Sequence, residues 1–178
     1  MTKNNFDPFR DRQARLIRNT LSSAFVVSLR DQNPAAVATA GNHLLEQEIA
    51  VEKRFYILDR LSRYKKCMAA IEHQGIKGIL PQSFVLWDAE LFFEVHEMLE
   101  GLWMQAQGRE KAALQGLIRA AGVYILMAGG SRQGVEKMAA KAAKALEENL
   151  TALAYFPSPQ LLLAKLRNLD PVPPKLLG

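Results

Sequence analysis

Apolar residues recur along most of the chain at the three- and four-residue spacing that places them on one side of an α-helix. This spacing predicts helices over residues 11–30, 34–72, 87–107, 109–128, 131–150 and 158–166. The second range is long for a globular helix, so we expect a break near Glu46–Glu52. Because no segment alternates apolar and polar residues as a strand does, the sequence predicts an all-α, compact helical bundle of about six or seven helices, without a sheet.

A cluster of glycine and proline interrupts this helical pattern. Gly75, Gly78 and Pro81 separate an N-terminal helical region, residues 11–74, from the remainder, and they mark the expected internal boundary. A chain of 178 residues is nevertheless long enough to bury a single core. We therefore expect one all-α domain over residues 1–178.

The stretch 87–107, WDAELFFEVHEMLEGLWMQAQ, combines an apolar side with many acids and has one histidine but no lysine or arginine. Its five carboxylates are Asp88, Glu90, Glu94, Glu97 and Glu100. At 3.6 residues per turn, the apolar side is formed by Leu91, Val95, Met98, Leu99 and Leu102. We place Glu90, Glu94 and Glu97 opposite this side, where a row of solvated carboxylates is expected.

His96, Glu100 and Trp103 follow one another along one side of the same predicted helix. The four-residue spacing of an imidazole and a carboxylate is that of two ligands of one metal ion. Glu97 is rotated about 100° from His96, so it is not expected to share the role of His96. Two ligands do not make a useful metal site, and a second helix has to supply another. The alternative is a half-buried hydrogen bond between His96 and Glu100, covered by the indole of Trp103.

Established catalytic and metal motifs do not account for this spacing. A zincin needs a second histidine where the chain has Glu100. A di-iron bundle needs Glu-x-x-His, whereas only Val95 lies between Glu94 and His96. No Ser/His/Asp or Cys/His arrangement is recognisable.

Gln115 and Arg119 are the main polar residues within the apolar helix predicted over 109–128, and they lie four residues apart on one side. Buried polar groups need partners, and by pattern the nearest are His96 and Glu100 on the preceding antiparallel helix. With Trp103, these residues form a candidate polar site. It is either a structural hydrogen-bond network or a site for a small polar ligand or a divalent metal ion.

The run from Phe93 to Trp103, FEVHEMLEGLW, followed by LQGLI over residues 114–118, resembles the uncharacterised prokaryotic domain-of-unknown-function family 309. The family signature is His-x-x-x-Glu-x-x-Trp/Tyr with a downstream Gln-Gly-Leu-Ile-Gln. The resemblance covers residues 84–150, the expected family core, and leaves residues 11–74 outside. It implies a small helical protein that binds metal without an established activity. The signature residues fall at His96, Glu100, Trp103 and Gln115.

Two positions depart from the family pattern. The second glutamine is Arg119, and a histidine often found one or two turns later falls in the segment Tyr124-Ile125-Leu126. The chain thus lacks one candidate ligand and gains a cation. If Arg119 reaches Glu100, its guanidinium occupies the place of a metal, because it pairs with a carboxylate through two hydrogen bonds. This departure favours a structural network over an enzyme.

Composition places the chain among ordinary globular proteins, with 49% hydrophobic residues. Its single cysteine, Cys67, excludes an internal disulfide and fits a reducing compartment. The N-terminus has no apolar signal region, and the longest apolar run, residues 120–130, is too short to cross a bilayer. We therefore expect a cytoplasmic protein without a membrane partner.

The net charge of +5 is unevenly distributed. Residues 1–82 carry 13 Lys/Arg against 8 Asp/Glu, whereas residues 83–178 carry 10 of each. A basic half invites a nucleic-acid interpretation. However, acids are scattered among the bases and no binding motif accompanies them, so a nucleic-acid partner is disfavoured.

Three functions remain open at this point. The first is a non-enzymatic scaffold or a binding site for a small polar ligand or a divalent metal ion, with His43 as a candidate third metal ligand. The second is a metal-dependent hydrolase that uses His96 and Glu100. The third is a basic nucleic-acid-binding adaptor. A homo-oligomer is compatible with all three.

Overall fold

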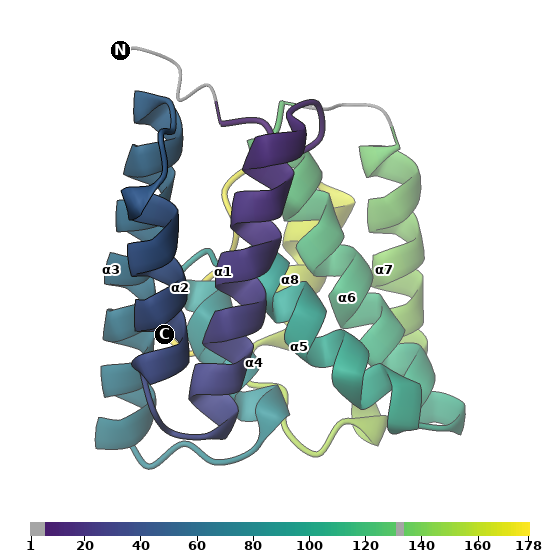
Figure 1. Ribbon diagram of the computed structural model, residues 1–178. Helices are drawn as coiled ribbons and strands as arrows, with labels where there is room; N and C mark the ends of the chain where they lie inside the picture. Colours follow the sequence, from purple (N-terminus) through teal and green to yellow (C-terminus); the bar gives the residue numbers. More distant parts are fainter. Residues whose placement is uncertain (1–5, 131–133) are drawn as a thin grey trace. The chain divides into compact units, whose positions relative to one another are not determined.

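The computed structural model describes residues 6–130 and 134–178, and these ranges contain helices but no strand (Figure 1). Their eight α-helices are α1 (Arg12–Arg30), α2 (Ala35–Glu46), α3 (Val51–His73), α4 (Ile79–Asp88), α5 (Phe92–Gln105), α6 (Gly108–Ala128), α7 (Val135–Asn149) and α8 (Pro159–Arg167), with a 3₁₀ turn, η1, over Leu150–Ala152. The all-α prediction is confirmed, and the number of helices is slightly above the expected six or seven because α4 is a helix of its own. The predicted start of the helix over 131–150 lies outside the described residues. None of the described helices has the length and apolar composition needed to cross a bilayer.

The chain forms two compact units, Met1–His73 and Gln74–Gly178. The first contains α1 to α3, and the second contains α4 to α8. The division falls next to Gly75, the first glycine of the segment that the sequence marks as an internal boundary.

In the first unit, α1 packs against both α2 and α3. The ring of Phe25 on α1 is stacked on the ring of Tyr64 on α3, with centroids 4.0 Å apart. Both side chains are almost fully buried, so this pair is a central contact of the unit. The break expected near Glu46–Glu52 is confirmed, since α2 ends at Glu46 and α3 begins at Val51.

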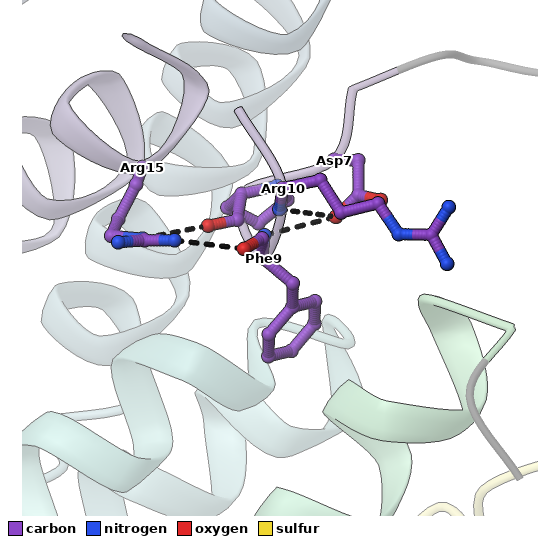
Figure 2. Close-up of polar contacts among 5 residues, drawn as sticks. Asp7, Phe9, Arg10 and Arg15 are labelled. Atoms are coloured by element: carbon purple, nitrogen blue, oxygen red, sulfur yellow. Dashed lines mark hydrogen bonds and ion pairs between the residues drawn. The ribbon is translucent and has the colours of Figure 1, made fainter. Parts of the chain in front are cut away.

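The segment before α1 is folded against the first turns of that helix (Figure 2). The guanidinium of Arg15 donates hydrogen bonds to the carbonyl oxygens of Pro8, at 2.9 Å, and Phe9, at 2.8 Å. The carboxylate of Asp7 accepts hydrogen bonds from the backbone N–H groups of Phe9 and Arg10, at 2.9 and 3.3 Å. These bonds pair backbone groups outside regular structure, and Arg15 therefore helps to hold the segment against α1.

In the second unit, α6 lies between α5 and α7 and packs along both (Figure 1). The α6 helix is apolar on nearly all sides, and its buried residues include Ala113, Leu114, Leu117, Ala121 and Val123. The neighbouring helices extend this core, because α4 packs on α5 and α8 packs on α7. The arrangement holds α5 along one side of α6.

A tight turn separates α4 from α5, although no glycine or proline marks it. Glu90 has a left-handed backbone with φ of 58°. Its N–H donates to the Trp87 carbonyl at 2.8 Å, and the N–H of Leu91 donates to the Leu86 carbonyl at 2.9 Å. These two bonds form a Schellman motif, which ends a helix. The prediction of one continuous helix over residues 87–107 is therefore wrong, and α5 begins only at Phe92.

The chain after α8, residues 171–178, is held against α4, and we call it the strap. The indole N–H of Trp87 donates a buried hydrogen bond of 2.9 Å to the carbonyl of Pro174. The carboxylate of Asp88 accepts a hydrogen bond of 2.6 Å from the N–H of Leu176. The Leu176 side chain is buried, so the strap is a packed part of the second unit.

Candidate metal-binding site

The α5 helix carries three polar ligand groups close together, beside its buried apolar side. The buried apolar side is formed by Phe92, Val95, Met98 and Leu99. One ligand atom each from His96, Glu97 and Glu100 lies within 4.8 Å of the other two, and we call these residues the α5 cluster. One nitrogen and two carboxylate oxygens are a donor set that suits a divalent metal ion.

The imidazole of His96 contains a buried polar atom that lacks a hydrogen bond. The side chain as a whole is 32% exposed, yet Nδ1 is buried and has no hydrogen-bond partner among residues 6–130 and 134–178. Oε1 of Glu97 lies 3.6 Å from Nδ1, which is beyond hydrogen-bond distance and makes an ion pair only when the imidazole is protonated. Buried polar atoms are nearly always paired in folded proteins, so Nδ1 is a candidate ligand atom.

Glu97 belongs to the cluster, although its rotation around the helix predicts that it does not share the role of His96. The rotation of about 100° between successive residues describes Cβ positions and not the ends of long side chains. A glutamate has three rotatable bonds, and here they bring the carboxylate back around the helix toward Nδ1. The third donor thus comes from α5 itself, not from a second helix as the sequence suggests.

Glu94 also differs from its expected position. Its side chain is fully buried, so the prediction of a solvated carboxylate at this position is wrong. Around the helix, Glu94 is only about 40° from Met98 and about 60° from Leu91. It therefore lies at the edge of the apolar side and not opposite it. A helical wheel of the sequence shows this position.

Gln115 and Arg119 lie on α6 and are partly buried. Among the described residues, neither makes a hydrogen bond or an ion pair with His96 or Glu100. Gln115 and Arg119 thus do not form the expected polar network with His96 and Glu100. The guanidinium of Arg119 does not take the place of a metal at Glu100.

Trp103 makes a different contact from the one expected. The ammonium of Lys111 lies over the indole ring, 4.4 Å from its centroid, which is a cation–π contact. Trp103 and Lys111 therefore bracket the turn between α5 and α6. The expected role of the Trp103 indole, to cover His96 and Glu100, stays a prediction.

His43 is exposed on α2 and belongs to the first unit. Its side chain makes no hydrogen bond or ion pair with any residue that the structure describes. Its assignment as a third metal ligand stays a prediction, and the α5 cluster already supplies three donors without it.

Several cations of the basic N-terminal region are neutralised by acids. The ion pairs, with their N–O distances, are Arg10–Asp7 at 3.7 Å, Arg30–Asp31 at 2.8 Å, Lys53–Asp11 at 2.7 Å and Arg63–Asp59 at 2.9 Å. The hydrogen bond from Lys53 lowers the pKa of the Asp11 carboxyl, and the backbone N–H of Ala14 adds to this effect. Four of the positive charges of this unit are therefore paired with acids.

The comparison with protein families places the α5 cluster inside a known domain. Residues 80–138 match the model of the family described as Domain of unknown function (DUF309). This segment is a DUF309 domain. It covers about a third of the 178 residues, and it includes α5, α6 and most of α4. The segment expected from the sequence, residues 84–150, overlaps it over most of its length.

The DUF309 domain contains His96, Glu97, Glu100, Trp103, Gln115 and Arg119. Its description assigns no function. Neither a curated protein nor a solved structure matches the chain. Any function of the DUF309 domain in this chain therefore has to be argued from the chemistry of its residues.

Proposed function

We propose that the protein binds one divalent metal ion, of the zinc type, through His96, Glu97 and Glu100 in its DUF309 domain. The observation that carries this proposal is Nδ1 of His96, which is buried and lacks a hydrogen-bond partner among the described residues, with a carboxylate oxygen of Glu97 3.6 Å away. A metal ion supplies the partner that this nitrogen otherwise lacks.

The donor set decides which metals are expected. Imidazole nitrogen suits zinc, copper, iron and nickel, whereas magnesium and calcium prefer oxygen ligands alone. One imidazole and two carboxylates therefore favour zinc or a similar transition metal over magnesium. Three protein ligands also leave a coordination position open, as catalytic zinc sites do. A bound ion supplies Lewis acidity at that position.

The α5 cluster requires only small side-chain movements to bind an ion. Zinc bonds of about 2.0–2.2 Å bring tetrahedral ligand atoms within about 3.5 Å of one another, compared with separations of up to 4.8 Å here. The side chain of Glu97 is 38% exposed and Glu100 is exposed. Both carboxylates are free to rotate toward Nδ1 without disturbing the core.

The other functions considered have less support. A structural network linking His96 and Glu100 to α6 lacks the hydrogen bonds that define it, as described above. Hydrolysis at the open position stays a prediction, because binding is what the donor set supports directly. The nucleic-acid adaptor is weakened by the ion pairs of the first unit.

The test is calorimetric titration of the metal-free, full-length protein with zinc, and with magnesium for comparison. We expect one zinc per chain and much weaker magnesium binding. His96→Ala should abolish zinc binding. Glu97→Gln and Glu100→Gln should each weaken it by at least the ~10-fold that loss of a supporting partner causes. Cobalt bound in place of zinc should show a visible spectrum that changes in His96→Ala.

The matched control is Glu110→Gln, which removes an exposed carboxylate of α6 in the same domain and should leave zinc binding unchanged. Zinc binding that survives His96→Ala unaltered, or none in the unmodified protein, would contradict the proposal. The stability of the metal-free protein separates a structural role from a binding role. His96→Ala should shift its unfolding midpoint little, whereas a hydrogen-bonded structural histidine should cost about 1–3 kcal/mol.

A further inference from the structure

A pocket of about 300 Å³ opens on the second unit and shares no residue with the α5 cluster. It is open to solvent and is lined by Ile76, Lys77, Pro81, Tyr155 and Leu177. Small-molecule pockets in proteins have volumes of about 300–1,000 Å³ and apolar walls with a few polar groups. The composition of this lining fits that description, since four residues offer apolar surface and one offers a positive charge.

Contacts outside the pocket hold two of its walls. The side-chain amide of Gln82 on α4 donates a hydrogen bond of 3.2 Å to the carbonyl of Ile76. The ring of Tyr155 meets Phe84 edge-on, with centroids 5.9 Å apart, and Phe84 is itself fully buried. Ile76 and Tyr155 are therefore positioned without a ligand, and preformed walls lower the entropic cost of binding.

The strap supplies a third wall through Leu177. The carboxylate of Asp88 accepts a hydrogen bond of 3.0 Å from the N–H of Leu177, in addition to the one from Leu176. A charged acceptor makes both bonds stronger than neutral ones. Asp88 thus fixes the backbone of a lining residue without lining the pocket itself.

Lys77 gives the pocket its chemical preference. The residue is exposed, and its ammonium makes no ion pair or hydrogen bond with any residue in the described ranges. We infer that the pocket binds a small carboxylate with an aromatic or branched apolar body. The carboxylate lies at Lys77, and the apolar body lies against Pro81, Tyr155 and Leu177. A cation beside apolar walls complements such a ligand in both charge and surface.

The probes are phenylbutyrate and its neutral counterpart phenylbutanol, which share the apolar body and differ in charge. Each is titrated into the isotope-labelled full-length protein, and the amide NMR signals are followed. We expect saturable shifts centred on Ile76, Lys77 and Leu177 for phenylbutyrate. Binding of phenylbutanol should be about fivefold weaker, the factor that corresponds to an exposed ion pair of ~1 kcal/mol.

Variants separate charge from apolar contact. Lys77→Met should reduce phenylbutyrate binding to the level of phenylbutanol, and Lys77→Arg should retain most of it. Lys141→Met, which removes an exposed lysine of α7, is the matched control and should change nothing. Leu177→Ala should weaken both probes equally, because it reduces apolar surface and leaves the charge in place.

Two results would overturn the inference. Equal affinity for the charged and the neutral probe would remove the role of Lys77. Signals that shift elsewhere in the chain would show that the probes do not bind in this pocket. Affinities unchanged in both Lys77→Met and Leu177→Ala would show the same. Circular dichroism of each variant, with an unfolding transition like that of the unmodified protein, shows that the altered binding does not reflect unfolding.

Discussion

Gly116 on α6 lies directly against Leu146 on α7. A Cβ atom at position 116 would be 2.8 Å from Cγ of Leu146 and 3.1 Å from its backbone nitrogen. Real Cβ atoms essentially never lie 2.8 Å from another atom, and 3.1 Å is tighter than nine in ten real Cβ contacts. The atom at 3.1 Å is backbone, which cannot rotate away. The close approach of α6 and α7 therefore depends on the absence of a side chain at this position.

We predict that Gly116→Ala destabilises the protein by about 1–3 kcal/mol, the usual cost of overpacking a core. Urea unfolding monitored by circular dichroism measures this change. Gly101→Ala is the matched control, because Gly101 is also inside a helix but a Cβ there has nothing within 4 Å. It should stabilise the protein by up to ~1 kcal/mol, since alanine is the better helix former. Equal effects of the two substitutions would contradict the packing argument.

Tyr124 on α6 presents a second testable feature. Its hydroxyl is buried and has no hydrogen-bond partner among the residues that the structure describes, while its ring is packed against Trp87 and Phe92. Tyr124→Phe keeps the ring contacts and removes the unpaired group, so we expect a gain in stability of about 1 kcal/mol at neutral pH. Tyr155→Phe, at an exposed ring, should have little effect. A clear loss of stability in Tyr124→Phe would show that the hydroxyl has a partner.

Tyr124 should also control stability in alkali. Burial raises the pKa of its hydroxyl far above the usual value, and the negative charge of Asp170 adds to the shift. Above a pH of about 10, the unfolded chain loses this proton while the folded chain retains it, so the free energy of unfolding falls as pH rises. The fall should be shallower in Tyr124→Phe. Unfolding midpoints measured across the alkaline range test this.

The ion pair between Lys165 and Asp170 should affect the stability of the folded state in acid. The Lys165 ammonium lies 2.7 Å from the Asp170 carboxylate, and this hydrogen bond, with a smaller one from the N–H of Val172, lowers the pKa of Asp170. A lowered pKa stabilises the folded state above the unfolded pKa of about 3.9, and this contribution is lost as pH falls through the folded value. In Lys165→Met, the pKa of Asp170 should rise but stay below its usual value, because the Val172 bond remains. NMR titration of the side-chain carboxyl gives the value, and an unchanged pKa would contradict the assignment.

Asp88 should govern the opening of the strap. Asp88→Ala removes the acceptor of the Leu176 and Leu177 amides, and each bond to a charged group contributes about 1.5–3 kcal/mol. Hydrogen exchange of these two amides should therefore accelerate by at least about tenfold. Glu90→Ala is the control, since it removes only a 3.7 Å ion pair with Lys175. Equal exchange in both variants would show that Asp88 does not hold the strap.

Periodicity predicted the helices well because burial imposes it. The ranges 11–30 and 109–128 agree closely with α1 and α6, and the break expected near Glu46–Glu52 is present between α2 and α3. Long helices of this kind are specified by many apolar positions at once. No single residue has to be interpreted correctly for the prediction to succeed.

The turn between α4 and α5 was not predictable in this way. The left-handed position that ends a helix is usually glycine, but here Glu90 occupies it, and Gln32 after α1 and Leu169 after α8 have the same sign of φ. At each of these helix ends, two backbone hydrogen bonds of the Schellman type accompany the conformation and offset the local preference against it. The sequence carries no residue type that reveals it.

The candidate site was predicted in part. His96 and Glu100 are in the α5 cluster as expected from their spacing. Glu97 was missed because helix rotation locates Cβ and not the end of a flexible side chain. The hydrogen bonds expected from Gln115 and Arg119 to His96 and Glu100 are not formed. Their position on one side of α6 does not fix where their long side chains point.

The α5 cluster draws all its donors from little more than one helical turn, and this has a thermodynamic consequence. An ion held there would close only a very short loop and would tie together no distant parts of the chain, so it would remove little entropy from the unfolded ensemble. The ion should then raise the melting temperature only through its binding to the folded state, by an amount set by ion concentration and affinity. The protein would therefore fold without such an ion. A zinc finger, in contrast, does not fold without its metal.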